Sequence, residues 1–241
     1  MNLVIDIGNT QVKAAVFELD TLLEHFIFDE KDFVEKIQNI LKKHQVAQCI
    51  LSSVKETQQN FIKELEEIPS FIILDLNIKV PFKNLYKTPT TLGKDRIALV
   101  AASVVQFPSR NSLIIDAGTC ITYDFINSKN EYLGGAISPG INIRYKSLNH
   151  YTSKLPLLSK NEVQNIIGKS TSDSIHSGII NGVIQEINGV IGQYSEEFED
   201  LTVILTGGDT KFLSKQLKNS IFANQNFLLY GLNKILTFNN Q

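Results

Sequence analysis

The strongest constraint on the fold is a stretch near the N-terminus that recurs in the second half of the chain. The first copy, LVIDIGNTQVKAAVF, begins at Leu3, and the second, LIIDAGTCITYDF, begins at Leu113. Each copy is an apolar triplet, then Asp, one residue, Gly, then Thr, and then a stretch that ends in Phe. Asp6 and Asp116 lie 110 positions apart in a chain of 241 residues. A repeat at nearly half the chain length predicts a duplicated structural unit.

The rest of the chain alternates between strand and helix patterns. The first copy predicts an antiparallel meander that also includes residues 22–28. Beyond it we expect helices at 30–43, 57–67, 94–106, 142–150, 171–194 and 210–218, and strands at 49–51, 71–74, 113–116, 121–126 and 201–205. Thr171 or Ser172 is expected as the N-cap of the long helix. Strands that alternate with helices indicate an α/β fold.

We therefore predict two related α/β lobes, residues 1–109 and 110–241, divided at the turn of residues 108–111. The last apolar segment, residues 228–236, is expected to pack on the body of the protein. One candidate surface for this packing is the first lobe. Two lobes that face each other would leave a cleft, where small-molecule sites commonly lie.

The composition of the chain argues against several classes of binding partner and metal site. Its 23 Lys and Arg residues against 25 Asp and Glu give a formal charge of −2, with no block of like charges. This balance argues against a nucleic-acid or membrane-surface binder. The two cysteines, Cys49 and Cys120, favour neither a disulfide framework nor a Cys-based metal site. Asp6 interrupts the first apolar run and no segment has the length of a membrane span, so we expect a cytosolic protein without a signal peptide.

Three predicted strands run into turns that combine Gly with Thr or Asp, at residues 6–10, 116–119 and 206–209. Such turns expose backbone N–H groups, and Gly lets a phosphate approach them closely. Thr10 and Thr119 add hydroxyl donors, whereas Asp6 and Asp116 can hold a cation that bridges to phosphate. A pair of such turns predicts a clamp for a nucleoside triphosphate. The alternative is that each Asp-x-Gly is an ordinary turn between strands.

The sequence resembles the acetate and sugar kinase–Hsc70–actin (ASKHA) phosphotransferases, and within them the type III pantothenate kinases. The matching motifs are DIGNTQVK from Asp6, TLGKDRIA from Thr91, DAGTCITYD from Asp116, GGAISPG from Gly134, LPLL from Leu155 and GKSTSDSIHSGIING from Gly168. The resemblance implies two duplicated ribonuclease H-like (actin-like ATPase) lobes with a nucleotide cleft between them. It also implies ATP-dependent phosphorylation of pantothenate, the first step of coenzyme A synthesis.

The resemblance implies roles for single residues on the nucleotide side. Asp6 would hold Mg²⁺ or its water shell, and Asp116 would bind a monovalent cation, K⁺ or NH₄⁺. Contacts to ATP and its phosphates are implied for Asp6, Gly8, Asn9, Thr10, Lys13, Gly118, Thr119, Gly207 and Gly208. Lys13 lies on a strand, where a surface position is the alternative for its side chain.

On the acceptor side, the resemblance implies that pantothenate contacts Tyr86, Gly93, Lys94, Asp95, Arg96 and Thr171. Asp95 suits the general base that takes the hydroxyl proton, and the Arg96 guanidinium suits the substrate carboxylate. The ordinary alternatives are an acid in the first turn of a helix for Asp95, a packing residue for Tyr86 and a helix N-cap for Thr171.

Two other functions stay open at this point. The chain could be an ASKHA kinase for another small hydroxy acid, or a non-catalytic nucleotide-binding regulatory factor. Members of the family are homodimers, and the apolar helix from Thr171 could supply the dimer surface. A helix buried in the core of one chain explains the same apolar positions nearly as well.

Overall fold

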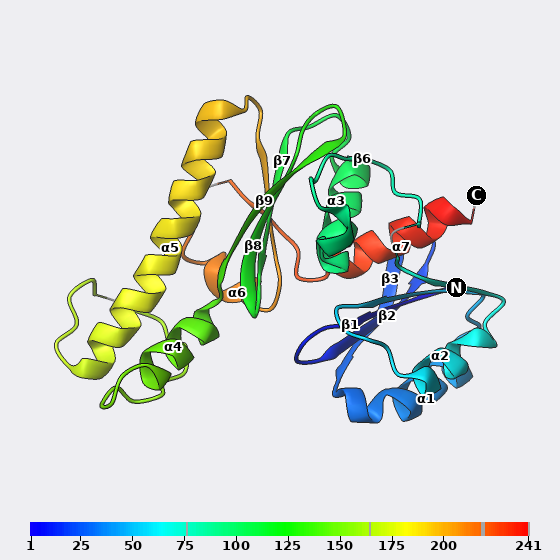
Figure 1. The fold of residues 1–241 in the computed structure, drawn as a ribbon, viewed down its shortest axis with the longest axis horizontal. Helices are drawn as coiled ribbons and strands as arrows, with labels where there is room; N and C mark the ends of the chain where they lie inside the picture. The colour runs from blue at the N-terminus through cyan, green and yellow to red at the C-terminus, as the bar shows by residue number, and fades with distance from the viewer. Residues whose placement is uncertain (76, 164, 218–219, 241) are drawn as a thin grey trace. The chain divides into compact units, whose positions relative to one another are not determined.

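The two related stretches of sequence form the central hairpins of two separate sheets. In the first, β1 (Asn2–Ile7) pairs with β2 (Val12–Glu18), and in the second, β7 (Ser112–Ala117) pairs with β8 (Cys120–Ile126). Both pairs are antiparallel. The computed structural model describes residues 1–75, 77–163, 165–217 and 220–240, and Figure 1 shows its elements.

The chain forms two units, and each has its own core. The first unit contains Met1–Ser109, Lys129–Leu133 and Asn226–Gln241, and the second contains Arg110–Ser128 and Gly134–Gln225. None of the helices in the described part of the chain is long and apolar enough to cross a membrane.

The sheet of the first unit has the strand order β3-β2-β1-β4-β5. Its other strands are β3 (Thr21–Phe28), β4 (Gln48–Ser53) and β5 (Ser70–Ile73). The predicted meander is confirmed, because β2 pairs antiparallel with both of its neighbours. A 3-10 turn at Glu30–Asp32 leads into α1 (Phe33–Lys43), which packs on the sheet with α2 (Gln59–Glu66). The rings of Phe33 and Phe61 stack between these two helices, 4.0 Å apart.

The second sheet repeats this order of strands. It reads β11-β10-β7-β8-β9-β6, so that β7 lies between its hairpin partner β8 and the parallel strand β10, as β1 lies between β2 and β4. The remaining bounds are β9 (Glu131–Pro139), β10 (Thr202–Thr206), β11 (Phe222–Ala223) and β6 (Lys83–Asn84). The duplication predicted from the sequence is therefore a duplication of sheet topology.

Three helices belong to the second unit: α4 (Ile141–His150), α5 (Thr171–Glu197) and α6 (Thr210–Leu213). The apolar side chains of α5 are buried in the core of this unit, and Ile180, Val183 and Ile187 have no exposed surface. Burial within one chain was one of the two explanations that the sequence allowed for these apolar positions. The predicted N-cap is wrong by one residue. Ser170 is extended and its hydroxyl accepts the Asp173 N–H at 3.1 Å, so neither Thr171 nor Ser172 has this role.

Another expectation that fails is the length of the helix that starts at Thr210. It ends at Leu213, where a run to Lys218 was expected, and Lys218 itself lies outside the described residues. The backbone continues from Ser214 to Leu217 in single turns, whose N–H groups bond back to residues 210 and 213.

Two helices of the first unit pack unusually closely. A 3-10 turn at Pro89–Thr91 precedes α3 (Lys94–Gln106), whose bounds are those predicted, and α7 (Phe227–Asn239) is in contact with it and with β1. A Cβ added to Gly231 of α7 would lie 1.9 Å from the Ala98 carbonyl oxygen and 3.2 Å from Ala102 Cβ. The absence of a side chain at Gly231 thus allows the two helix backbones to touch.

We expect Gly231→Ala to lower the free energy of unfolding by about 1–3 kcal/mol, because the added methyl group forces α3 and α7 apart. Gly182→Ala on α5 is the matched control, since a Cβ there meets no atom within 4 Å. The control should gain up to about 1 kcal/mol from helix propensity. Urea unfolding measures both, and equal stability of the two variants would contradict the close packing.

Candidate functional site

Asp6 lies at the end of the central strand β1, where the chain turns away from the sheet. Its side chain is buried, with 5% of the residue exposed. Ser52 is its register partner on the parallel strand β4 and donates its hydroxyl hydrogen to Asp6 Oδ1 at 3.0 Å. Lys13 is its register partner on the antiparallel strand β2. A carboxylate is therefore held between one hydroxyl and one cationic residue.

The charge of Asp6 is destabilised by its surroundings. Burial raises the pKa of Asp6 from an ordinary 3.8 to about 6, against the opposing effects of Lys13 and of the Ser52 hydrogen bond. The carboxylate of Asp95 raises this pKa further, which places the two predicted acids within electrostatic reach of each other. Perturbed carboxyl groups of this kind are concentrated at functional sites.

The turn that follows Asp6 is tight and solvent-exposed. Gly8 donates its N–H to the Gln11 carbonyl at 3.1 Å, which closes the turn, and Asn9 and Thr10 are exposed at its tip. Exposed backbone N–H groups at the tip of a turn can bind a phosphate group.

The predicted acceptor residues Asp95 and Arg96 start α3. Asp95 Oδ1 accepts the Arg96 N–H at 2.8 Å, and a Cβ on Gly93 would lie 2.4 Å from the same oxygen. Arg96 is only 5% exposed, and its guanidinium carbon lies 5.6 Å from the centre of the Tyr86 ring. Tyr86 in turn stacks on Tyr132 at 6.1 Å. The structure thus brings Tyr86, Asp95 and Arg96 together, with Lys94 half-buried beside them at the start of the helix.

Asp116 occupies the place in the second sheet that Asp6 has in the first. Its register partners are Thr122 on β8 and Thr206 on β10, so a hydroxyl residue again lies on the parallel neighbour. Gly118 donates its N–H to the Cys120 carbonyl at 2.9 Å, and Thr119 is exposed at the tip of this turn.

The Gly-Gly-Asp turn after β10 packs directly on the turn after β7. Gly207 has φ = +95°, and a Cβ there would lie 2.3 Å from Asp116 Oδ1 and 2.4 Å from the Ala117 carbonyl oxygen. Asp209 donates its N–H to that same carbonyl at 2.9 Å, and its buried carboxylate pairs with Lys160. Gly208 is exposed. Only glycine fits between these two turns.

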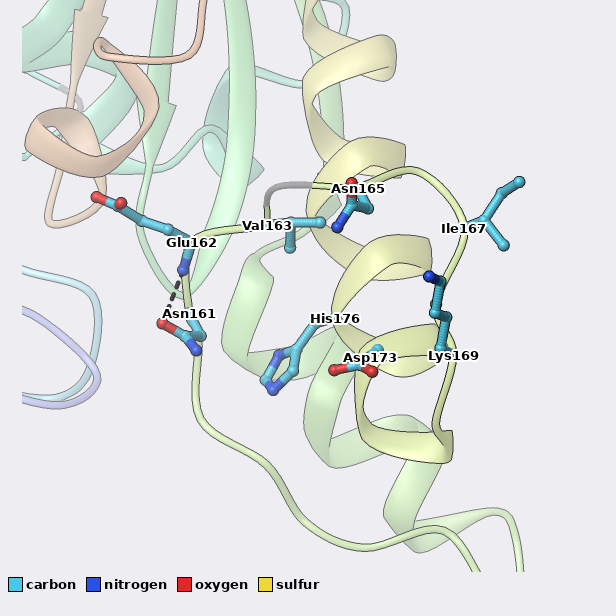
Figure 2. A pocket seen from close by; sticks show the side chains of 9 residues that line it. Asn161, Glu162, Val163, Asn165, Ile167, Lys169, Asp173 and His176 are labelled. Carbon is cyan, nitrogen blue, oxygen red and sulfur yellow. Dashed lines mark hydrogen bonds between the residues drawn. The ribbon is translucent and has the colours of Figure 1, made fainter.

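Thr171 starts α5 and is exposed, lining a surface pocket of about 680 Å³ with Leu155 and Ile175. A second pocket of about 290 Å³ lies beside it and is lined by α5 and by side chains of residues 161–163 and 165–169 (Figure 2). In that view His176 points from the helix toward the part of the loop that carries Asn161. The Nδ1 atom of His176 is 2.7 Å from the Tyr145 hydroxyl.

Single carboxylates at Asp6 and Asp116 fit the cations that a phosphotransferase uses. Mg²⁺ keeps several waters and is commonly held by one or two carboxylates together with substrate phosphates. Within the described ranges no three His, Cys, Asp or Glu side chains gather as a metal site. Asp116 is half-buried, whereas Asp6 is buried.

A family model described as type III pantothenate kinase matches residues 2–193. The chain belongs to this family. It is 55% identical to the type III pantothenate kinase of Christiangramia forsetii over 99% of both chains. It is also 47% identical to that of Flavobacterium johnsoniae over 97% of this chain and 96% of the other.

Solved structures with low identity show the same fold. A protein from Campylobacter jejuni described as a Baf family transcriptional activator is 23% identical, with a TM-score of 0.64 over 99% of this chain and 98% of that one. The ROK hexokinase of Thermus thermophilus is 10% identical, with a TM-score of 0.55 over 99% of both chains. The chain therefore has the fold of the hexokinase, which agrees with the two-lobed fold implied by the resemblance to the ASKHA phosphotransferases.

Sequence reasoning missed Ser52, the nearest partner of Asp6. The signal was present, because the apolar strand that ends in Ser52-Ser53 in the first half corresponds to the one that ends in Thr206-Gly207 in the second. Lys160 was missed as well, since it lies 49 positions from Asp209 in sequence and no spacing rule joins them.

We expect Asp6→Asn to be more stable than the wild-type kinase at pH 7 in metal-free, nucleotide-free buffer, by about 3 kcal/mol. Because the folded state binds the Asp6 proton more tightly than the unfolded chain, the wild type should lose stability relative to Asp6→Asn as the pH rises from about 4 to about 6. Urea unfolding across this interval measures the effect.

Asn at position 6 carries no charge, so this part of the pH dependence should vanish in the variant. The exposed Asp200→Asn is the control and should follow the wild-type curve. A variant less stable than wild type at pH 7, with the same pH slope, would show that the Asp6 charge is not costly to bury.

Proposed function

We propose that this chain phosphorylates pantothenate with ATP, giving 4′-phosphopantothenate and ADP, as the first step of coenzyme A biosynthesis. The observation that carries the proposal is the cluster at the start of α3, where Asp95 precedes the buried Arg96 and the Arg96 guanidinium lies against the Tyr86 ring. Membership of the type III pantothenate kinase family supports the choice of substrate.

ATP is assigned to the three Gly-containing turns. The N–H groups of Asn9, Thr10 and Thr119 and the hydroxyls of the two threonines are proposed phosphate ligands, because exposed turn amides bind anions. Gly8 and Gly118, whose own N–H groups close the two turns, are proposed to let a phosphate come close to the backbone. Lys13 adds a positive charge beside Asp6. The Gly207-Gly208 turn is assigned to the adenosine part of the nucleotide.

Asp6 is the proposed residue for Mg²⁺ or its water shell, and Asp116 for K⁺ or NH₄⁺. When bound, these cations supply positive charge against the phosphate oxygens, where negative charge develops during transfer. A cation at Asp6 would also offset the cost of burying its carboxylate, which otherwise raises the pKa of this group.

The acceptor is assigned to the cluster at the start of α3. Arg96 presents a buried guanidinium that can pair bidentately with the carboxylate of pantothenate, and the Tyr86 ring packs against it. Gly93 and Lys94 form the adjoining backbone, and Thr171 is a further proposed contact of the substrate. A site with one residue for a hydroxyl group, Asp95, and one for a carboxylate, Arg96, is suited to bind a hydroxy acid.

Asp95 is the proposed general base. It takes the proton from the terminal hydroxyl of pantothenate, the hydroxyl oxygen attacks the γ-phosphorus, and the bond to the β-γ bridging oxygen breaks to release ADP. Its hydrogen bond from the Arg96 N–H holds one carboxylate oxygen in place. The other oxygen is available to the acceptor hydroxyl.

Two other functions make different predictions. A kinase for another hydroxy acid would keep the three turns and change the residues around Arg96. A non-catalytic regulatory factor would have no need of a base, whereas this chain keeps Asp95 at the start of α3 beside Arg96.

The decisive experiment is an ADP-release assay with ATP, Mg²⁺ and pantothenate, with and without K⁺. We expect pantothenate-dependent ADP in the wild type, and a loss of about 10²–10⁴-fold in turnover for Asp95→Asn with pantothenate still bound. Asp200→Asn again serves as the control.

No pantothenate-dependent ADP would contradict the proposed activity as a whole. Near-normal turnover of Asp95→Asn would remove only the base. Activity that is independent of K⁺ and NH₄⁺ would count against the role of Asp116 alone.

We further propose that the kinase works as a homodimer in the cytoplasm, where its substrate ATP is held. Large apolar side chains between α4 and α5 are strongly exposed, with Tyr151 at 82%, Ile166 at 81% and Ile167 at 75%. Exposed apolar groups of this size are typical of interfaces. Light scattering should give twice the chain mass of 27.0 kDa, and a value equal to one chain would contradict the dimer.

A further inference from the structure

Arg144 on α4 is the centre of a hydrogen-bond network that the roles assigned above leave unused. Its Nη2 donates to Glu186 Oε2 on α5 at 2.5 Å and to Ser138 Oγ at 3.1 Å. Its Nε donates to the Pro139 carbonyl at 2.9 Å. One guanidinium therefore ties the last two residues of β9 to the middle of the long helix.

Glu186 completes the network from the other side. Its Oε1 accepts the Tyr123 hydroxyl of β8 at 2.9 Å. Burial acts to raise the pKa of Glu186, but hydrogen bonds from Arg144, Ser138 and Tyr123 outweigh it and lower the pKa, so Glu186 is a carboxylate at neutral pH. The side chains of Arg144 and Glu186 are 21% and 28% exposed, which shields the pair from solvent more than a surface pair.

The segment that Arg144 holds continues directly into the second phosphate turn. Gly140 follows Pro139 and donates its N–H to the Thr119 carbonyl at 3.1 Å. A Cβ on Gly140 would lie 2.2 Å from the Gly118 carbonyl oxygen and 2.4 Å from that of Thr119. The backbone at Gly140 is therefore packed against the turn without any intervening side chain.

We propose that Arg144 and Glu186 are positioning residues for the Gly118–Thr119 turn. The pair holds residues 138–140 against the turn and keeps its N–H groups and the Thr119 hydroxyl in place before the nucleotide arrives. The inference rests on the proposed function, in which this turn binds ATP phosphate. Phosphate-binding groups that are already in place keep the geometry that phosphoryl transfer requires, whereas a mobile turn does not. Small misplacements of such groups reduce reaction rates strongly.

The test is a pair of nearly isosteric variants, Arg144→Met and Glu186→Gln, made singly and together. We expect kcat/KM for ATP to fall about 10-fold in each, with KM for pantothenate changed less than about 2-fold. The double variant should be no worse than either single one, because both break the same pair. Tyr123→Phe, which removes one hydrogen bond at the edge of the network, should have a smaller effect.

Arg110→Met and Glu196→Gln are the matched controls, since both side chains are exposed and lie in the same unit. Both should retain wild-type kinetics. Arg144→Lys keeps the charge but not the fork that reaches Glu186 and Pro139 together, so an intermediate value is expected. If Arg144→Met fails to fold, Arg144→Lys and Glu186→Gln decide the question.

Unchanged kcat/KM for ATP in both single variants would overturn the proposal. A similar rise in KM for ATP and in KM for pantothenate, with a lower melting temperature, would also overturn it, because this indicates a general structural role. Calorimetric titration with Mg²⁺-ADP keeps this inference separate from the proposed function. If the wild type binds Mg²⁺-ADP but forms no product from pantothenate, the function fails, whereas a loss of ADP affinity confined to the network variants still supports the positioning role.

Discussion

The carboxylate of Asp6 is almost completely buried at the end of a central strand, and its charge has to be offset by its neighbours at neutral pH. The fold places three groups around it from three elements: the Ser52 hydroxyl, the Lys13 side chain and the Asp95 carboxylate. The first two stabilise the charge and the third destabilises it. A protein that only needed to fold would be more stable with a neutral residue here, so the cost of the charge is an argument for chemistry.

The second sheet repeats this arrangement with different chemistry around it. Asp116 has Thr206 on the parallel strand where Asp6 has Ser52, and it is half-buried where Asp6 is buried. The turn after β10 is packed on Asp116 through Gly207, and the Arg144 network holds the end of β9 against the Gly118–Thr119 turn. The duplicated topology thus provides two equivalent positions for an acid, and the surrounding residues make them unequal.

The sequence predicted the features that depend on local pattern. The duplicated hairpins, the meander and the bounds of α3 follow from periodicity and turn residues, which act over a few positions. It missed the contacts that depend on how distant segments meet, such as Ser52 with Asp6 and Arg144 with Glu186. The N-cap of α5 was misplaced because four consecutive residues, Lys169 to Ser172, include three hydroxyl side chains, and backbone conformation alone selects Ser170.

The central claim is that the acids at the sheet ends serve transfer of the γ-phosphoryl group of ATP to a hydroxy acid. Phosphorus-31 NMR of a mixture of the protein, ATP, Mg²⁺, K⁺ and pantothenate tests it most directly. The account predicts that the γ-phosphate signal is replaced by one new phosphomonoester signal, and that Asp6→Asn forms none. Conversion of ATP to inorganic phosphate without a phosphomonoester, or equal product from Asp6→Asn, would contradict it.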